Sequence, residues 1–266
     1  MSWRKLLLIP RLVALTARAP RDQAKAWDLF WTRVRRTGPG GDALWDLGSE
    51  AELAAVEARL RAHVDLALPI VDVGCGNGRH TRRLATLSPK ALGVDVSPTA
   101  VARARDESRD VANVDFRAVD MSRPGEGRRL HEELGSANAY VRGVLHVMAP
   151  EAQRVMVENI HDFLGERGSL YVVETDFHGD SLDHLEYQGA TAGAIPEPLR
   201  LLIASGVRPP AHFSEREIDA FFPRSQWSRV AGEPTVLHTL PMHNRDGGAM
   251  DELTAYYAIV RVRAKA

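Results

Sequence analysis

Hydrophobic positions in the middle of the chain alternate between two kinds of segment. Short runs of aliphatic residues recur, and stretches with apolar residues at helical spacing lie between several of them. The runs predict five strands, at 69–73, 91–95, 114–119, 139–145 and 169–174. The intervening stretches predict helices at 79–87, 98–109 and 151–164. Strands that alternate with helices in this way predict a parallel sheet with helices on both faces.

The chain before the first strand has a helical pattern. Residues 21–36 carry an apolar stripe of Trp27, Phe30, Trp31 and Val34, and a Gly-Pro-Gly-Gly run at 38–41 then breaks the helix. Ser49 followed by Glu52 is a capping-box pattern that predicts a helix over 51–64. Residues 3–15 are apolar, but Pro10 and Arg11 split them, so we expect an amphipathic helix there rather than a signal peptide or a membrane span.

The chain after the fifth strand begins with an irregular segment. Residues 176–212 are rich in Gly, Pro, His and Asp, and such long insertions usually act as lids or binding segments. A short helix is expected from Ser214, followed by strands at 227–240 and 255–262. We therefore divide the chain into an N-terminal helical cap (1–66), a core (67–175), a lid insertion (176–212) and C-terminal strands that complete the core sheet (213–266).

Composition narrows the classes of function. The 266 residues are 44% hydrophobic and 26% charged, with a formal net charge of −1, which is typical of a globular protein and gives no indication of a nucleic-acid partner. Cys75 is the single cysteine, so neither an internal disulfide nor a multi-cysteine metal site is possible. A reducing, cytoplasmic location is consistent with this.

The segment with the strongest chemical signal runs from Asp72 to Arg79. A predicted strand leads directly into glycines at alternate positions, Gly74, Gly76 and Gly78, and a helix follows. Glycines here allow a sharp turn and close approach of a ligand, and the helix start adds free N–H donors. A dinucleotide fingerprint would place its third glycine where Arg79 stands, which disfavours an NAD-dependent oxidoreductase.

This segment resembles the first motif of the class I S-adenosylmethionine-dependent methyltransferases of the small-molecule, natural-product type. The resemblance spans residues 67–175 and implies a Rossmann-like seven-stranded, mostly parallel sheet with an antiparallel last strand. It implies that Asp95, at the end of the second strand, binds the ribose hydroxyls, and that Asp120 and Met121 hold the adenine. The implied cofactor is S-adenosyl-L-methionine, bound by Asp72, Gly74, Gly76, Gly78, Asp95, Asp120, Met121 and Arg142.

Each of these residues also has a purely structural interpretation. Asp72 can cap the backbone at a turn, and Asp95 is followed by Ser97-Pro98, which is turn chemistry. Asp120 and Met121 can equally serve the turn and the core. Arg142 can hold a cofactor carboxylate, hold a substrate carboxylate or cap a strand, and the sequence does not separate these roles.

A candidate general base follows the fourth strand. His146 lies where α/β sheets place ligands, in a segment similar to the Leu-His segment of small-molecule O-methyltransferases, in which the histidine is the base. The segment also resembles one of quinone-type methyltransferases, whose histidine has no such established role. A packing role for His146 is the alternative.

Departures from related patterns narrow the function further. The carboxylates that metal-dependent catechol-type enzymes place around the fourth strand are absent, since residues 137–138 are Ala-Asn, so no metal is expected. The Asn-Pro-Pro-Tyr motif of nucleobase methylases is also absent.

Aromatic and histidine residues outside the core are candidates for substrate contact. Trp27, Phe30 and Trp31, with Trp45, are expected to cap the active site, because aromatic faces accept a sulfonium cation, although such a stripe also suits a plain core. In the lid, His178, His184 and Tyr187 are candidates, with solvated loop positions as the alternative.

We therefore expect methyl transfer to a small-molecule acceptor, at a hydroxyl or carboxylate oxygen, in secondary metabolism. A protein that binds the cofactor but guides a cyclisation or rearrangement is the alternative. The apolar N-terminal helix can pack on its own domain or across a homodimer, and the sequence does not separate these two arrangements.

Overall fold

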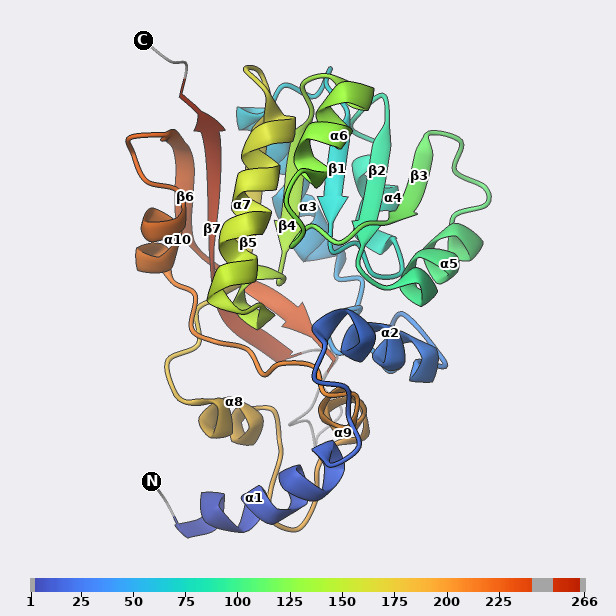
Figure 1. The fold of residues 1–266 in the computed structure, drawn as a ribbon, viewed down its shortest axis with the longest axis vertical. Coiled ribbons are helices and arrows are strands. Elements are labelled where there is room, and N and C mark those ends of the chain that lie inside the picture. Colours follow the sequence, from blue (N-terminus) through green and yellow to red (C-terminus); the bar gives the residue numbers. More distant parts are fainter. Residues whose placement is uncertain (1–2, 241–250, 264–266) are drawn as a thin grey trace.

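A seven-stranded sheet with the order β3-β2-β1-β4-β5-β7-β6 forms the centre of the computed structural model, which describes residues 3–240 and 251–263 (Figure 1). Strands β1 to β5 are parallel, and β7 pairs antiparallel with both β5 and β6. The strands are β1 (Ile70–Val73), β2 (Ala91–Asp95), β3 (Val114–Ala118), β4 (Asn138–Arg142), β5 (Ser169–Thr175), β6 (Trp227–Thr239) and β7 (Asp251–Val262). The predicted fold class is confirmed.

Helices cover both faces of the sheet, because strand side chains alternate between them. On β4, Ala139 and Val141 pack into a cluster with α6 and α7, whereas Tyr140 packs into a second cluster with α3 and α4. The helices of this core are α3 (Glu50–His63), α4 (Arg79–Leu84), α5 (Pro98–Glu107), α6 (Glu126–Leu134), α7 (Pro150–Leu164) and α10 (Glu215–Phe221).

A row of stacked aromatic rings crosses the second face. Tyr140, Tyr171 and Tyr257 lie on β4, β5 and β7 with ring centroids 5.4 and 5.6 Å apart, and His80 stacks on Tyr140 at 5.6 Å. The guanidinium of Arg59 closes the row 3.8 Å from the centroid of the Tyr257 ring. Such cross-strand pairs stabilise the junction between the parallel and antiparallel parts of the sheet.

Four more helices gather at the carboxyl ends of the parallel strands, below the sheet in Figure 1. They are α1 (Trp3–Thr16), α2 (Gln23–Arg33), α8 (Ser181–Tyr187) and α9 (Glu197–Ala204). The N-terminal and lid segments pack on each other there: Phe30 and Trp31 share an apolar cluster with Val207, and Leu8 shares another with Leu199. None of the helices in the described part of the chain combines the length and apolar character needed to cross a membrane.

The structure differs from the sequence-based expectation in three segments. The lid is not irregular, because it contains α8, which starts with a capping box between Asp180 and Asp183, and α9. Helix α6 was missed, because it has nine residues with only two apolar side chains, Leu130 and Leu134, and it directly follows a Pro-Gly pair at 124–125. The fourth strand ends at Arg142, and a 3-10 helix, η1 (Leu145–Val147), follows it.

Candidate functional site

The glycine segment forms a tight turn between β1 and α4. Gly74, Gly76 and Gly78 have φ values of 77°, 54° and 75°, in the left-handed region where a side chain costs free energy. The amides of Gly74 and Cys75 both donate to the carbonyl of Val94 on β2, at 2.8 and 3.1 Å. The turn is therefore held at the edge where ligands bind in open α/β sheets.

Asp72 lies beneath this turn. Its carboxylate is buried and accepts a hydrogen bond from the hydroxyl of Thr81 at 2.5 Å, and burial raises its pKa to about 7. Asp72 therefore joins β1 to the first turns of α4. A direct cofactor contact by Asp72 stays a prediction.

Asp95 ends β2 beside the same turn. One carboxylate oxygen accepts from the amide of Gly76 and the other from the amide of Ser97, both at 2.9 Å. Burial raises the pKa of Asp95 to about 6, against the opposing effect of these hydrogen bonds. A carboxylate has about four acceptor positions, so capacity remains for a hydroxyl of a vicinal diol such as ribose. The residues here fit the predicted cofactor.

Asp120 and Met121 follow β3 and differ in environment. The Asp120 carboxylate accepts from the amide and hydroxyl of Ser122 at 3.0 and 2.5 Å and pairs with Arg123 at 3.2 Å. The Met121 side chain is 5% exposed and belongs to the apolar cluster that includes α7. Adenine contacts by both residues stay predictions, and the surroundings of Met121 are those of a core residue.

The predicted aromatic cap lies against the glycine turn. A Cβ atom at Gly76 would lie 2.8 Å from Cζ2 of Trp31, so the indole ring covers this glycine directly. Trp27, Phe30 and Trp45 pack around it, with ring centroids 5.4 to 6.5 Å apart. Phe30 is fully buried in this cluster, so Trp31 is the cap residue in contact with the candidate cofactor loop.

A hollow of about 350 Å³ lies between α2 and the segment after β2, with Asp28 and Val96 in its wall. Asp28 accepts from the hydroxyl of Ser97 at 2.7 Å and from the amide of Thr99 at 3.0 Å, which ties the cap helix to the start of α5. A larger hollow of about 410 Å³ lies between α7 and α10, and none of the candidate cofactor residues lines it.

Arg79, which stands where a dinucleotide fingerprint would have its third glycine, is held by Asp46, a residue that the sequence analysis did not select. Asp46 is buried and accepts from Nε of Arg79, from the amide of Gly38 at 2.6 Å and from Nδ2 of Asn77 at 2.8 Å. The guanidinium fits between two glycines: a Cβ at Gly38 or Gly48 would come within 2.9 Å of it. Asp46 therefore anchors the glycine turn to the N-terminal segment.

Arg142, predicted to bind the cofactor, has a partner within the protein. Its Nε and Nη2 atoms donate to the carboxylate of Glu52 on α3, and both side chains are less than a tenth exposed. Glu52 also accepts from the amide of His238 at 2.8 Å. Burial favours a higher pKa for Glu52, but the charge and hydrogen bonds of Arg142, together with the charge of His80 and the amide of His238, outweigh burial and lower the pKa. A cofactor role for Arg142 would therefore need it to act alongside Glu52.

His146 lies on η1 and contacts a carboxylate that the sequence analysis did not select. Glu174 is fully buried and accepts from the amides of Val144, Leu145 and His146 at 3.0, 2.8 and 3.2 Å, and Nδ1 of His146 is hydrogen-bonded to it as well. An acidic residue near the end of an otherwise apolar strand was the available signal. With Nδ1 as donor, Nε2 of His146 is left as a proton acceptor.

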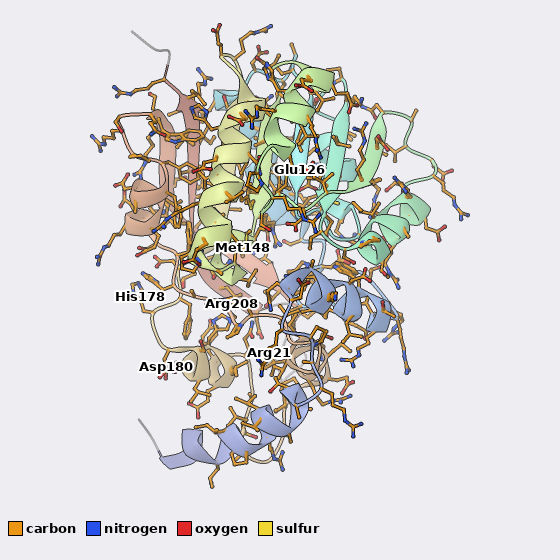
Figure 2. All side chains as sticks on the ribbon, in the orientation of Figure 1. Arg21, Glu126, Met148, His178, Asp180 and Arg208 are labelled. Carbon is orange, nitrogen blue, oxygen red and sulfur yellow. The ribbon has the colours of Figure 1, made fainter. Side chains whose placement is uncertain are left out.

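The lid histidines lie in different surroundings. His184 is buried next to the ring of Phe177, with ring centroids 4.8 Å apart, and burial together with the charge of His146 lowers its pKa to about 4. The hydroxyl of Tyr187 donates to the carbonyl of Glu252 at 3.0 Å. His178 is exposed and lies beside Asp176, and Figure 2 shows it on the segment between the sheet and α8.

Fold and site together define a Rossmann-like nucleoside-binding protein whose glycine turn, acidic β2 terminus and capped strand edge suit S-adenosylmethionine. Residues 70–168 match the family model of the methyltransferase domain. These residues therefore form a domain of the class I S-adenosylmethionine-dependent methyltransferases, a family of enzymes, and the predicted family and cofactor are confirmed for this part of the chain.

Three similar proteins illustrate the relationship. A methyltransferase structure from Anabaena variabilis is 25% identical, with a TM-score of 0.78 over 94% of this chain and 98% of that one. Magnesium protoporphyrin IX methyltransferase from Synechocystis, with bound S-adenosylhomocysteine, is 18% identical, with a TM-score of 0.54 over 83% and 85%, and shows the shared fold. Carboxy-S-adenosyl-L-methionine synthase from Chromohalobacter salexigens is 31% identical over 54% of this chain. The chain spans about half the length of that curated relative, 51%.

Proposed function

We propose that the protein transfers the methyl group of S-adenosylmethionine to an oxygen atom of a small molecule. The observation that supports this proposal is the hydrogen bond between Nδ1 of His146 and the buried carboxylate of Glu174. It lies at the carboxyl ends of the parallel strands, where the glycine turn also lies. A histidine held in this way is suited to accept a proton from a hydroxyl. We also propose a role in secondary metabolism and a cytoplasmic location, which the single cysteine suits.

Cofactor binding is assigned to the glycine turn and its neighbours. The backbone of Gly74, Gly76 and Gly78 would border the amino-acid end, Asp95 would accept from the ribose hydroxyls, and Asp120 would accept from the adenine amino group. Trp31, which already covers Gly76, would place an aromatic face near the sulfonium. When bound, the cofactor supplies an activated methyl group.

The chain's own residues would then perform three tasks. Nε2 of His146 takes the proton of the acceptor hydroxyl. Glu174 holds the imidazole in the required tautomer and stabilises the imidazolium that forms. The cap and lid exclude water and orient the acceptor, and orientation is a large part of methyl-transfer catalysis because the leaving group is already activated.

The segment boundaries support this division of labour. We propose that residues 1–66 form the cap, apart from α3, which packs on the sheet, and that 67–175 form the cofactor-binding core, 176–212 the lid, and 213–266 the strands that complete the sheet. Helices from the first and third segments both lie at the carboxyl ends of the parallel strands (Figure 1).

The test measures cofactor binding and turnover separately. Calorimetry should show binding of S-adenosylhomocysteine to the folded protein, and a panel of phenols and carboxylic acids should yield a methylated product. His146→Ala should lower turnover at least ~100-fold with cofactor affinity retained. The control His63→Ala, at the far end of α3, should behave as wild type. An unchanged rate in His146→Ala would remove this residue from the mechanism.

A second candidate is chemistry on the cofactor, or guided by it, without methyl transfer. The relative named carboxy-S-adenosyl-L-methionine synthase favours the first form, in which the sulfonium compound is itself the substrate. A cyclisation or rearrangement of another molecule is the second form. The masses of the products distinguish these candidates from methyl transfer. Methyl transfer replaces a proton of the acceptor with a methyl group and releases S-adenosylhomocysteine, whereas neither alternative releases S-adenosylhomocysteine.

A further inference from the structure

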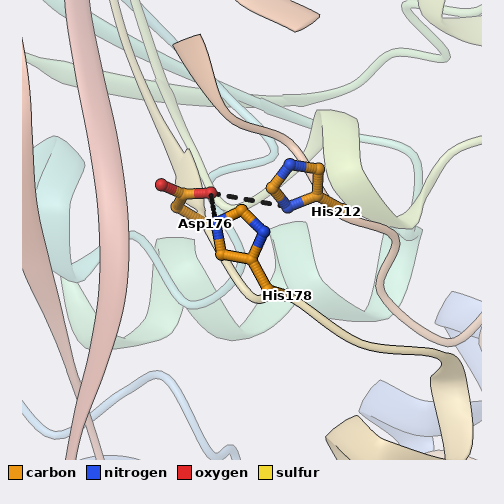
Figure 3. A group of neighbouring side chains, drawn as sticks. All are labelled: Asp176, His178 and His212. Atoms are coloured by element: carbon orange, nitrogen blue, oxygen red, sulfur yellow. Dashed lines mark ion pairs between the residues drawn. The ribbon is translucent and has the colours of Figure 1, made fainter. Parts of the chain in front are cut away.

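Three side chains with metal-ligand chemistry converge just beyond β5. Asp176 follows the last residue of the strand, His178 lies two residues further on, and His212 comes from the other end of the lid segment (Figure 3). The carboxylate oxygen Oδ1 of Asp176 lies 3.3 Å from Nε2 of His178 and 3.4 Å from Nδ1 of His212. One ligand atom from each residue lies within 4.8 Å of the other two.

These separations suit a single ion between the side chains. In a tetrahedral site with bonds of about 2.1 Å, neighbouring ligand atoms are about 3.4 Å apart. The two distances from Asp176 have this value. The ligand atoms of the two imidazoles lie within 4.8 Å of each other, and the side chain of His178, which is 78% exposed, has room to close this separation.

The backbone holds two of the three side chains in place. The amide of Asp176 donates to the carbonyl of Thr254 on β7, and the hydroxyl of Thr254 donates back to the carbonyl of Asp176, both at 2.8 Å. Next to His212, the amide of Ala211 donates to the carbonyl of His146 at 2.7 Å. The cluster is therefore fixed to the sheet on one side and to η1 on the other.

The carboxylate oxygen Oδ1 of Asp176, at the centre of the cluster, lacks a hydrogen-bond donor. Oδ1 is shielded from solvent and accepts no hydrogen bond, although both imidazoles are close to it. A buried carboxylate oxygen without a donor is costly, and an ion bound to it would remove that cost.

A competing explanation is that protonated histidines simply pair with carboxylates. His212 supports it, because Nδ1 lies 3.0 Å from the carbonyl of Phe177 and Nε2 lies 3.7 Å from a carboxylate oxygen of Glu217. Under this explanation the cluster would be a pair of ion pairs and would have no particular affinity for metal. The two explanations differ in a measurable way.

We propose that Asp176, His178 and His212 bind one divalent transition-metal ion such as Zn²⁺. Two imidazoles and one carboxylate are a donor set for zinc or iron(II), and three protein ligands leave a position open for water or another ligand. Along the strand, Asp176 is roughly 7 Å from Glu174, the partner of His146. The expectation of no metal rested on the fourth strand, whereas this cluster follows the fifth.

Metal titration of the untagged full chain tests the proposal. With Zn²⁺ in competition with a chromophoric chelator, wild type should bind one equivalent. Asp176→Asn and His178→Ala should each bind more than about 100-fold more weakly, since even the loss of a group that only orients a ligand costs about 10- to 100-fold. His63→Ala is the matched control and should bind as wild type does.

A second measurement keeps the result independent of folding. Co²⁺ added to wild type should give the visible absorption of a low-coordinate site, which Asp176→Asn lacks while its melting temperature stays at the wild-type value. The proposal is overturned if wild type binds no equivalent of Zn²⁺, or if His178→Ala and His63→Ala bind it equally well. S-adenosylhomocysteine binding, measured in the same samples, reports separately on the proposed function.

Discussion

Nδ1 of His146 is hydrogen-bonded to the carboxylate of Glu174, and both side chains are buried where β5 meets the turn after β4. The same carboxylate accepts from three successive backbone amides at the start of η1. One side chain therefore fixes both the position of the imidazole and its tautomer. This arrangement leads directly to a mutational prediction.

Glu174→Gln should lower kcat at least about tenfold, because a neutral amide stabilises an imidazolium less well and does not specify its tautomer. Affinity for S-adenosylhomocysteine should be retained, since no part of the glycine turn changes. Steady-state kinetics and calorimetry measure the two effects. Glu158→Gln, an exposed position on α7, is the matched control. A kcat equal to that of the control would show that Glu174 acts only in folding.

Asp95 predicts a pH dependence of cofactor binding. Its pKa is raised to about 6, so below pH 6 it becomes protonated and loses acceptor capacity for the ribose hydroxyls. The affinity for S-adenosylhomocysteine should therefore fall as pH decreases through 6, by up to about tenfold per unit. Calorimetry between pH 5 and 8 measures this, and Asp95→Asn should bind weakly without that dependence. Asp106→Asn, exposed on α5, should keep the wild-type profile.

The same raised pKa has the opposite sign for the fold without ligand. The folded value exceeds the unfolded one, so this carboxyl contributes stability that is fully present below its unfolded pKa and is lost as pH rises through about 6. Asp95→Asn should therefore make the free energy of unfolding less dependent on pH between 4 and 7. Chemical denaturation at a series of pH values measures this dependence. If the free energy of unfolding changed with pH as steeply in Asp95→Asn as in wild type, the assignment would be contradicted.

Gly76→Ala tests the contact between the turn and its aromatic cover. The left-handed backbone alone costs about 1–3 kcal/mol for a residue with a side chain, and the added methyl would also lie 2.8 Å from Trp31. We expect lower stability and at least tenfold weaker binding of S-adenosylhomocysteine, which corresponds to about 1.4 kcal/mol. Gly40→Ala shares the positive φ but has open space, so it separates the two costs. Equal effects of both substitutions on binding would rule out the contact with Trp31.

Glu52→Gln should be strongly destabilising. It leaves the buried guanidinium of Arg142 without a counter-charge, and breaking a buried pair in this way costs about 3–5 kcal/mol. Glu57→Gln, on the same helix but in exposed pairs with Arg61 and Arg83, should have little effect on stability. Chemical denaturation compares the two. Similar values would mean that Arg142 finds another partner.

Local patterns were sufficient to predict most of the core. Apolar runs marked each strand, and the glycine turn and Asp95 follow from the order of strand, turn and helix, because short-range sequence determines such geometry. Helices α6, α8 and α9 were missed because each is nine residues long or shorter and lies next to Gly or Pro, so the helix-breaking residues outweighed a short apolar pattern.

Partners distant in sequence could not be predicted. Glu52 and Arg142 are 90 residues apart, and Asp46 and Arg79 are 33 apart, so nothing in either local pattern indicates the pairing. The metal-type cluster has the same origin, because His212 approaches Asp176 only when the lid segment has returned to the sheet. Charged residues near strand ends are therefore better interpreted as a set than one at a time.

The apolar contacts shared by the N-terminal and lid helices have a consequence for access to the strand edge. Phe30 packs with Val207, and Leu8 packs with Leu199. Displacement of the N-terminal segment or of the lid segment would therefore expose apolar surface on the other. We therefore expect the two segments to move together, and we expect a truncation that removes α1 to loosen the packing of α9 as well.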